Sequence, residues 1–423
     1  MLPPALRHRR YRLLWLGLMV SIAGTQMQSA AILWHVNELS GLPIALGMVG
    51  LVRILPVLIF SLMAGVAADF FNRRRVLLLT QSCLALLALS LGVLTDRGLD
   101  RLWVVYAITA ASAAVASFDL PARQALVPNL VPPEILSNAF SLNSIAFQVG
   151  AILGPALGGL VLAQLGLAYA YWINAFSYLA VIAALLLMGP VAQARMAGTR
   201  SSAGECLPLA HLLRSIREGM RFVGHQPIIL SSMLLDFFAT FFSSATFLLP
   251  IFAKQILAVG VVGYGWLVAA PAIGAASVAA VIAFYGRPIR RQGRVLLAAV
   301  VGFGLATVVF GLSRQFGLTF AALILTGATD GISTIIRNTI RQLQTPDHLR
   351  GRMTSVNQIF FMGGPQLGEL EAGLVAQWLG APFSVVTGGL GCLLGIALIA
   401  ARFPQLGRYD GSEVRAAAPA RPG

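Results

Sequence analysis

The sequence is divided into about twelve apolar blocks, each long enough to cross a lipid bilayer as a helix of about 20 residues. Only 11% of the 423 residues are charged, whereas soluble domains have about 25%. Too little polar surface is present to cover a globule in water. We therefore expect an all-α integral membrane protein with 12 transmembrane helices. The expected spans are 12–36, 44–68, 76–95, 102–124, 136–163, 168–189, 227–253, 261–285, 295–313, 317–340, 353–377 and 382–402.

The blocks form two groups of six, separated by the longest polar connection. We expect an N-terminal six-helix bundle at 1–189, a linker at 190–226, a C-terminal six-helix bundle at 227–405 and a disordered cytoplasmic tail at 406–423. Within the linker, the apolar positions of "LLRSIREGMRFV" predict a helix that lies along the membrane surface.

The arginines indicate how the chain is oriented. The net charge of +15 comes largely from short basic groups between the apolar blocks, such as "RHRRYR", "RRR", "RPIRRQGR" and "LRGRM". If both termini are cytoplasmic, these groups all fall on the cytoplasmic side, which is the positive-inside pattern. The charge therefore reflects topology and not nucleic-acid binding. Lys254 is the single lysine, a bias typical of GC-rich bacterial genomes, and we expect the bacterial inner (cytoplasmic) membrane.

The second half of the chain repeats features of the first half. "GVAADFFNRRRV" after the second block corresponds to "GRPIRRQGRV" after the eighth, and "GPALGG" in the fifth corresponds to "GPQLGE" in the eleventh. Two parallel repeats related by an axis along the membrane normal would place a binding cavity between them.

These motifs resemble those of the major facilitator superfamily, and the resemblance covers essentially the whole chain. "GVAADFFNRRR" is similar to the family's loop 2–3 signature, and "GAILGPALGG" is similar to the fifth-span signature of its antiporters. "PARQALVPNLVPPE" resembles the branch of enterobactin exporters and macrolide efflux proteins, the transmembrane secretion effectors. Phe70, Asn72 and Arg290 depart from the signature, where the family has a basic residue, a glycine and an aspartate. The resemblance implies the major facilitator fold of two pseudo-symmetric six-helix bundles.

The loop 2–3 signature implies a gating latch at the cytoplasmic edge of the second span. Asp69 would cap the helix of the eleventh span and pair with Arg123, holding the two halves closed on the inside. The alternative is that the arginines only anchor the chain by the positive-inside rule. The latch residues are Gly65, Asp69, Arg73, Arg74 and Arg123.

The fifth-span motif combines small residues with a proline. Gly150, Gly154 and Gly158 are four residues apart, so they share one helix face that admits close approach. Pro155 permits a bend, and Gly159 completes the motif. The resemblance implies that this stretch lies against a span of the other half and seals the protein for export. Ordinary packing of small residues is the alternative.

Ionisable residues inside spans are candidates for function, because each is costly unless it is paired or hydrated. We expect Asp236 to carry the coupling proton, with Asp330 and Glu369 as further candidates; structural ion pairs are the alternative. His35 and Glu38 are expected at the solvated outer end of the first span. The candidates for the cavity or for proton coupling are Arg53, Asp119, Asp236, Asp330, Arg337 and Glu369, and Asp119 and Arg337 hold matching places in the two repeats, where they would pair.

The motifs favour a secondary transporter over other classes. Lys254 follows no glycine-rich loop, which excludes ATP hydrolysis by a P-loop, and no nucleophile–base set or metal cluster is present in the sequence. We expect proton antiport with alternating access that exports a small hydrophobic or amphiphilic molecule, such as a drug, a macrolide or a siderophore. A proton-coupled nutrient symporter is the alternative, and a non-transporting sensor or enzyme is a remote one. We expect lipid, protons and substrate as partners, with no cofactor, metal or nucleic acid, and a monomer.

Overall fold

The computed structural model describes residues 3–191, 220–242, 244–285, 291–345 and 350–410. Inside helices, the side chains at 62, 64–70, 245, 350–352 and 354–362 are outside this description. The described residues form helices joined by short turns, with no strand among them. Because lipid offers no partner for backbone N–H and C=O groups, a chain with such long apolar helices satisfies them within each helix.

Eleven described helical segments are long and apolar enough to cross a membrane. Each overlaps one of the expected spans, and the remaining expected span, 353–377, lies within helix α13. Large apolar side chains such as Phe284 and Trp378 are 90% and 82% exposed, as is usual for side chains that face lipid.

The chain divides into two compact units, which we describe separately. One comprises Met1–Thr199 and Phe247–Ala269, and the other comprises Arg200–Thr246 and Ala270–Gly423. The helices of the first unit are α1 (Arg9–Ser40), α2 (Pro43–Phe70), α3 (Arg73–Asp96), α4 (Leu102–Leu126), α5 (Leu136–Gln164), α6 (Leu167–Met188) and α9 (Leu249–Ile251). The second unit contains α8 (Pro227–Phe242), α11 (Gln292–Leu312), α12 (Phe316–Gln344), α13 (Arg350–Leu379), α14 (Ala381–Arg402) and α15 (Pro404–Arg408), and α10 (Gly260–Tyr285) contributes to both units.

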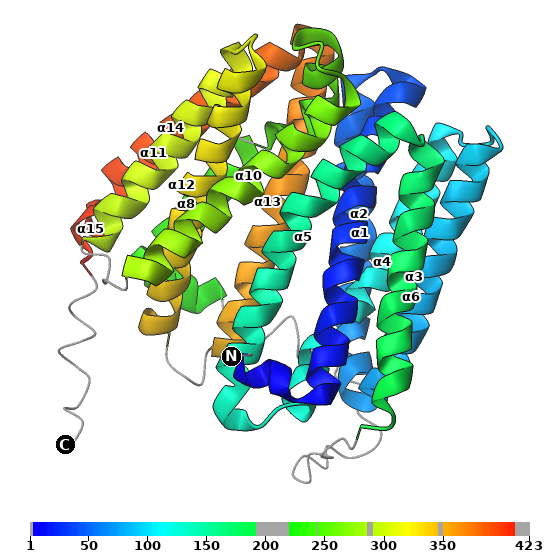
Figure 1. Cartoon of the computed structure of the whole chain (residues 1–423). Coiled ribbons are helices and arrows are strands. Elements are labelled where there is room, and N and C mark those ends of the chain that lie inside the picture. The colour runs from blue at the N-terminus through cyan, green and yellow to red at the C-terminus, as the bar shows by residue number, and fades with distance from the viewer. Residues whose placement is uncertain (1–2, 192–219, 243, 286–290, 346–349, 411–423) are drawn as a thin grey trace, which may run out of the picture. The chain divides into compact units, whose positions relative to one another are not determined.

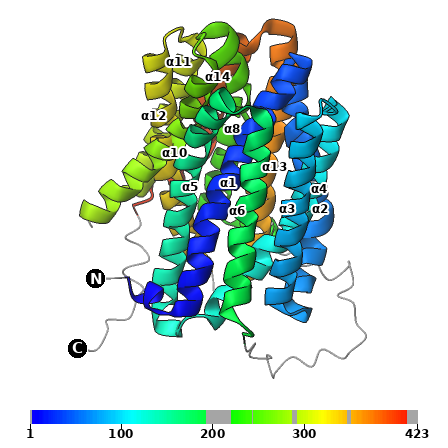
Figure 2. The same cartoon turned by 45° about the vertical axis from the view of Figure 1, so that its right-hand side comes forward.

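In the first unit, α1 packs along both α5 and α6, while α3 packs against α4 and α6, and α2 against α4 (Figure 1). Figure 2 shows α1, α5 and α6 side by side from a second direction. The core of this unit includes Tyr11 and Leu126, which are fully buried, and the Tyr11 hydroxyl donates to the Ala139 carbonyl at 2.7 Å. Gly41 ends α1 with a φ of 63°, a left-handed conformation that glycine adopts without strain.

Residues 247–269 were expected in the C-terminal bundle, but their contacts place them in the first unit. The Tyr264 hydroxyl donates to the Ala30 carbonyl at 2.8 Å, and its ring lies 5.2 Å from that of Trp34. These contacts explain the difference, because a buried tyrosine hydroxyl needs a partner. The division into bundles at 189 and 227 therefore does not coincide with the division made by the contacts.

In the second unit, α11 packs against α12 and α14, and α8 packs against α13 and α14. Leu235, Leu296, Ile336 and Ile340 form part of its fully buried core.

The tail expected to be disordered from 406 is ordered in its first residues. Helix α15 extends to Arg408, and Leu406 and Tyr409 are buried against the start of α11. The Gly293 N–H donates to the Tyr409 carbonyl at 2.9 Å, which fixes this segment. Residues 411–423 lie outside the described ranges, as does the expected surface helix of the linker up to residue 219; the chain is helical again from Met220.

Candidate functional site

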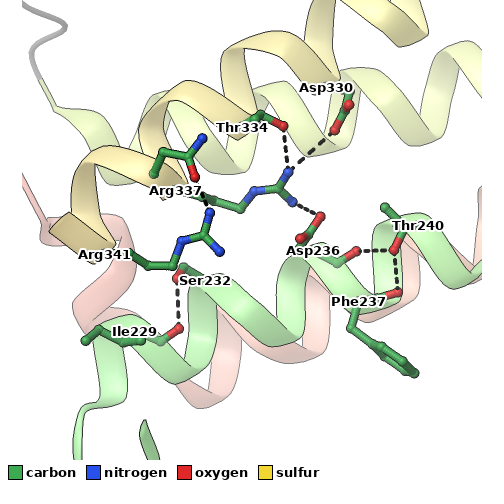
Figure 3. A network of polar contacts seen from close by, with 10 residues as sticks. Ile229, Ser232, Asp236, Phe237, Thr240, Asp330, Thr334, Arg337 and Arg341 are labelled. Carbon is green, nitrogen blue, oxygen red and sulfur yellow. Dashed lines mark hydrogen bonds and ion pairs between the residues drawn. The ribbon is translucent and has the colours of Figure 1, made fainter. Parts of the chain in front are cut away.

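The second unit contains a buried ion-pair cluster built from α8 and α12 (Figure 3). Arg337 of α12 pairs through Nη1 with Asp236 Oδ1 of α8, and the two residues are only 5% and 6% exposed. Arg337 Nη2 lies 3.5 Å from Asp330 Oδ1 and donates to Thr334 Oγ1 at 2.9 Å. The guanidinium of Arg337 therefore forms ion pairs with two carboxylates.

Helical spacing brings these groups together. Asp330, Thr334 and Arg337 are separated by four and then three residues, so they lie on one face of α12. Leu235 and Ile336, the neighbours of the two paired residues, are buried in the same core cluster, which holds α8 and α12 at a fixed distance. A buried charge without a partner costs about 3–5 kcal/mol, so the pair is a strong constraint on this contact.

The two carboxylates of the cluster differ in their access to solvent. The Asp236 side chain is 9% exposed, while that of Asp330 is 52% exposed and lines a cavity of about 180 Å³. The cavity is also lined by hydroxyl side chains of α8, α11 and α12 and by Pro271 of α10. Asp330 is therefore the member of the cluster that a proton or a ligand can reach.

Asp236, Asp330 and Arg337 were all expected as candidates, but Arg337 has a different partner from the expected one. Asp119 was expected to pair with Arg337, whereas each of them has a partner within its own unit. The rotation of α12, which aims Arg337 at α8, decides this pairing, and spacing along the chain does not reveal it.

In the first unit, Asp119 of α4 lies at the centre of a second buried polar cluster. Its Oδ1 accepts hydrogen bonds from Thr80 Oγ1 at 3.0 Å and from Gln81 Nε2 at 2.7 Å, and its Oδ2 accepts from Arg123 Nη2 at 2.8 Å. The expected partner of Arg123 was Asp69. Its described partner is Asp119, four residues earlier on the same helix, a spacing that predicts such a pair.

The arginines of the expected latch donate to backbone carbonyl groups. Arg73 Nη1 donates to the Ala125 carbonyl at 3.0 Å, and Arg74 Nε donates to the Leu185 carbonyl at 2.8 Å. They attach the start of α3 to α4 and α6. Gly65 and Asp69 belong to the last turns of α2, and their side-chain surroundings lie outside the described residues, so the latch stays a prediction.

Asn72, which replaces the signature glycine, has a structural role of its own. It is the N-cap of α3, and its side-chain oxygen accepts from the backbone N–H groups of Arg74 and Arg75 at 3.1 and 3.2 Å. The departure from the signature therefore satisfies two donors that the helix start leaves without partners.

The glycines of the α5 motif face two different helices. A Cβ on Gly150 would meet Ala23 at 3.1 Å, and one on Gly154 would meet Met27 at 3.0 Å, so this face packs on α1 of the same half. Gly158 also faces Met27. The expected contact with a span of the other half is made by Gly159, which lies against α10, and by the Pro155 carbonyl. The stretch therefore reaches the other half through Gly159 and Pro155, while the three glycines spaced four residues apart pack on α1, as in the alternative of ordinary small-residue packing.

His35 was expected at a solvated end of its span, but it is 1% exposed. Its Nδ1 lies 2.9 Å from the Tyr171 hydroxyl of α6, and its Nε2 lies 2.8 Å from Asp100 Oδ2, in the connection between α3 and α4. A histidine bonded on both ring nitrogens joins three segments. Glu38 accepts from Trp34 Nε1 at 2.8 Å.

Two further candidates, Glu369 and Arg53, are placed in other helices. Glu369 is half-buried in α13. The preceding residue, Gly368, packs closely on α8, because a Cβ added there would meet the Phe241 carbonyl oxygen. Arg53 is half-buried in α2 of the first unit. In the described ranges, no group of three or more His, Cys, Asp or Glu side chains is arranged to hold a metal ion.

Comparison with known proteins gives a consistent family and fold. Residues 2–419 match the model of the transmembrane secretion effector family. The chain is 28% identical over 398 residues to the multidrug efflux pump Tap of Mycolicibacterium fortuitum, covering 92% of this chain and 94% of that protein. It is 28% identical over 346 residues to the enterobactin exporter EntS of Escherichia coli, covering 80% of this chain and 78% of that protein.

Solved structures of transporters share the fold at low sequence identity. A bacterial homolog of the human lysosomal transporter Spinster aligns with a TM-score of 0.70 at 15% identity, covering 97% of this chain and all of that one. A POT family transporter in complex with 5-aminolevulinic acid aligns with a TM-score of 0.73 at 11% identity, covering 94% and 96% of the two chains. At these identities the likeness concerns the fold, which is the major facilitator fold.

Proposed function

The chain belongs to the transmembrane secretion effector family, whose members are major facilitator transporters and not enzymes, and from this premise we propose that it exports a small hydrophobic or amphiphilic molecule in exchange for protons. It is a multi-pass membrane protein, since eleven described helices are long and apolar enough to cross a membrane and its family is one of membrane transporters. The direction of transport is supported by the relatives, which are named as an efflux pump and an exporter.

The arrangement of the Asp236–Arg337–Asp330 cluster is the observation that supports proton coupling. Asp236 holds Arg337 in a buried pair, while Asp330 has a longer contact with the same guanidinium and faces the cavity. Protonation of Asp330 leaves the buried pair intact, whereas protonation of Asp236 would leave Arg337 buried with one distant partner. Asp330 is therefore the better proton carrier, and Asp236 is the residue that positions Arg337.

Alternating access requires contacts that close and open one side of the protein. The signature residues Gly65, Asp69, Arg73 and Arg74 are proposed as the cytoplasmic latch, with Arg123 as the partner of Asp69 during part of the cycle. Arg123 supports this assignment, because its Nε is buried and has no hydrogen-bond partner among the described residues. A carboxylate that reaches this donor would satisfy it.

The protein is proposed to act as a monomer in the inner membrane of a bacterium, with both termini in the cytoplasm. The supporting observation is the distribution of arginines, which gather in the connections on one side of the expected topology.

Transport in inverted membrane vesicles tests the proposal. With an acidic vesicle interior, the vesicles should accumulate at least one of three labelled compounds, namely ethidium, a macrolide or a catecholate siderophore. Nigericin, which collapses the pH gradient, should stop the accumulation. Accumulation that does not depend on the pH gradient would overturn proton antiport. Uptake of a nutrient only into right-side-out vesicles with an acidic exterior would favour the symporter instead.

A further inference from the structure

The cavity of the second unit is lined by oxygen atoms that act as hydrogen-bond acceptors. Five hydroxyl side chains line it, including Thr246, and the other four each donate their proton to a nearby backbone carbonyl group. Thr240 donates to the Asp236 carbonyl at 2.8 Å, Thr307 to Phe303 at 2.9 Å and Thr326 to Leu323 at 2.7 Å, and Ser244 donates to Thr240. Since the protons of these four hydroxyls are used in bonds to the backbone, the hydroxyls offer their oxygen lone pairs to the cavity.

The charge at the cavity wall is negative. Among the described lining residues, Asp330 is the only charged one, and 52% of its side chain is exposed. The Arg337 guanidinium lies 3.5 Å from Asp330 and is held closer to Asp236. A carboxylate has about four acceptor positions, so this contact leaves Asp330 able to bind a donor in the cavity.

The size of the cavity indicates an organic group. Its volume of about 180 Å³ exceeds the ~150 Å³ of an apolar cavity known to hold benzene. Phe303, Phe310 and Leu323 supply apolar walls beside the hydroxyls. A group of about eight heavy atoms with one end rich in N–H donors would fit both the size and the chemistry.

We propose that this cavity binds the protonated amine of an amphiphilic substrate, with Asp330 as its counter-ion and the hydroxyl oxygens as its acceptors. The inference deepens the proposed function and rests on it, because it assigns a charge class to the exported molecule. The ammonium group and the coupling proton then compete for one carboxylate, so binding of one releases the other. An anion would meet a carboxylate and a wall of acceptors, which disfavours it.

A pair of probes that differ in charge but not in size tests the site. Benzylammonium and benzyl alcohol each have eight heavy atoms. With the purified full-length protein in detergent at pH 7, saturation-transfer NMR should give a dissociation constant at least tenfold lower for the ammonium. Phenylacetate, the anionic probe, should not compete. Equal affinity for the two probes, or no measurable binding of benzylammonium, overturns the proposal.

Variants of the cavity wall locate the binding. Asp330→Asn should reduce the preference for benzylammonium to threefold or less, and Thr326→Val should weaken benzylammonium binding about two- to fivefold without affecting benzyl alcohol. Thr329→Val is the matched control, because this hydroxyl lies one turn away on α12, bonds to Leu325 and Thr326, and is not part of the described cavity wall. It should bind both probes as the wild type does. An unchanged preference in Asp330→Asn overturns the proposal.

Two further results separate this inference from the proposed function. Displacement of benzylammonium by an equal concentration of sodium would show an inorganic cation site and would overturn the amine assignment. Gradient-driven efflux of a neutral macrolide combined with equal binding of the two probes would overturn the inference alone. Tight ammonium binding without gradient-driven efflux would overturn only the export function.

Discussion

Gly159 of α5 and Gly265 of α10 meet backbone to backbone. A Cβ on Gly159 would lie 3.1 Å from the Gly265 Cα and 2.9 Å from the Val261 carbonyl oxygen, and a Cβ on Gly265 would lie 2.9 Å from the Gly159 Cα. Neither neighbour is a flexible side chain that could turn away. Even one methyl group therefore forces the two helices apart.

Gly159→Ala should destabilise the protein by about 1–3 kcal/mol, the usual cost of overpacking a close contact. It should also reduce efflux, since the motif then no longer seals against α10. The measurements are thermal unfolding in detergent and the vesicle assay. Gly317→Ala is the control, because a Cβ at that helical glycine meets no atom within 4 Å. It should be neutral or slightly stabilising, and a Gly159→Ala protein equal to this control would contradict the close contact.

The capping role of Asn72 can be tested by replacing its side chain, which supplies the acceptor oxygen. Asn72→Ala removes the acceptor that caps α3, and such a loss costs about 1 kcal/mol. Asn72→Gly restores the family's signature residue and should cost only a few tenths of a kcal/mol, because glycine is tolerated at an N-cap. Thermal unfolding of the two variants should therefore rank alanine below glycine. The reverse order would mean that the cap does not stabilise the helix.

His35 joins α1, α6 and the α3–α4 connection, so its replacement should lower the free energy of unfolding. His35→Ala leaves Tyr171 and Asp100 without their described partner, and an unsatisfied buried polar group costs about 1–3 kcal/mol. His225→Ala provides a comparison, since that exposed side chain bonds only the Arg221 carbonyl in its own helix among its described contacts. Similar melting temperatures for the two variants would show that the two hydrogen bonds of His35 contribute nothing to stability.

The sequence was sufficient to predict the fold and to single out the charged residues of the cluster, but it did not indicate which of them are paired. The length of the apolar blocks, the placement of the charges and the repeats indicate how many helices form and that they cross the membrane. Asp236, Asp330 and Arg337 stand out because a charge is rare within an apolar block. Which charges meet depends on how each helix is rotated about its axis, and neighbouring residues along the chain do not report this. For His35, the partner Asp100 lies 65 residues away in a polar connection, so no local pattern indicates that the histidine is buried.

Asp330 and Asp236 should respond differently to neutralisation. Asp330→Asn removes the carboxylate that faces the cavity, so gradient-driven efflux should stop while the melting temperature stays near that of the wild type. Asp330→Glu keeps an acidic group and should retain part of the activity. The vesicle assay measures both. Full gradient-driven efflux by Asp330→Asn would remove this residue from proton coupling.

The buried pair of Asp236 and Arg337 should behave as one unit. Arg337→Met leaves Asp236 6% exposed with no described cation in contact, and we expect a loss of about 3–5 kcal/mol of stability. Asp236→Leu should cause a similar loss, because it leaves Arg337 with the 3.5 Å contact to Asp330. Replacing both residues removes both buried charges. The double variant should therefore be more stable than either single variant, since an apolar pair of similar volume is often neutral or stabilising in place of an ion pair.

The elution profile and the melting temperature in detergent measure the stability of these variants. Additive losses in the double variant would show that the two residues act independently. The double variant should still fail to export, because without Arg337 the carboxylate of Asp330 loses the partner that holds it beside the cavity.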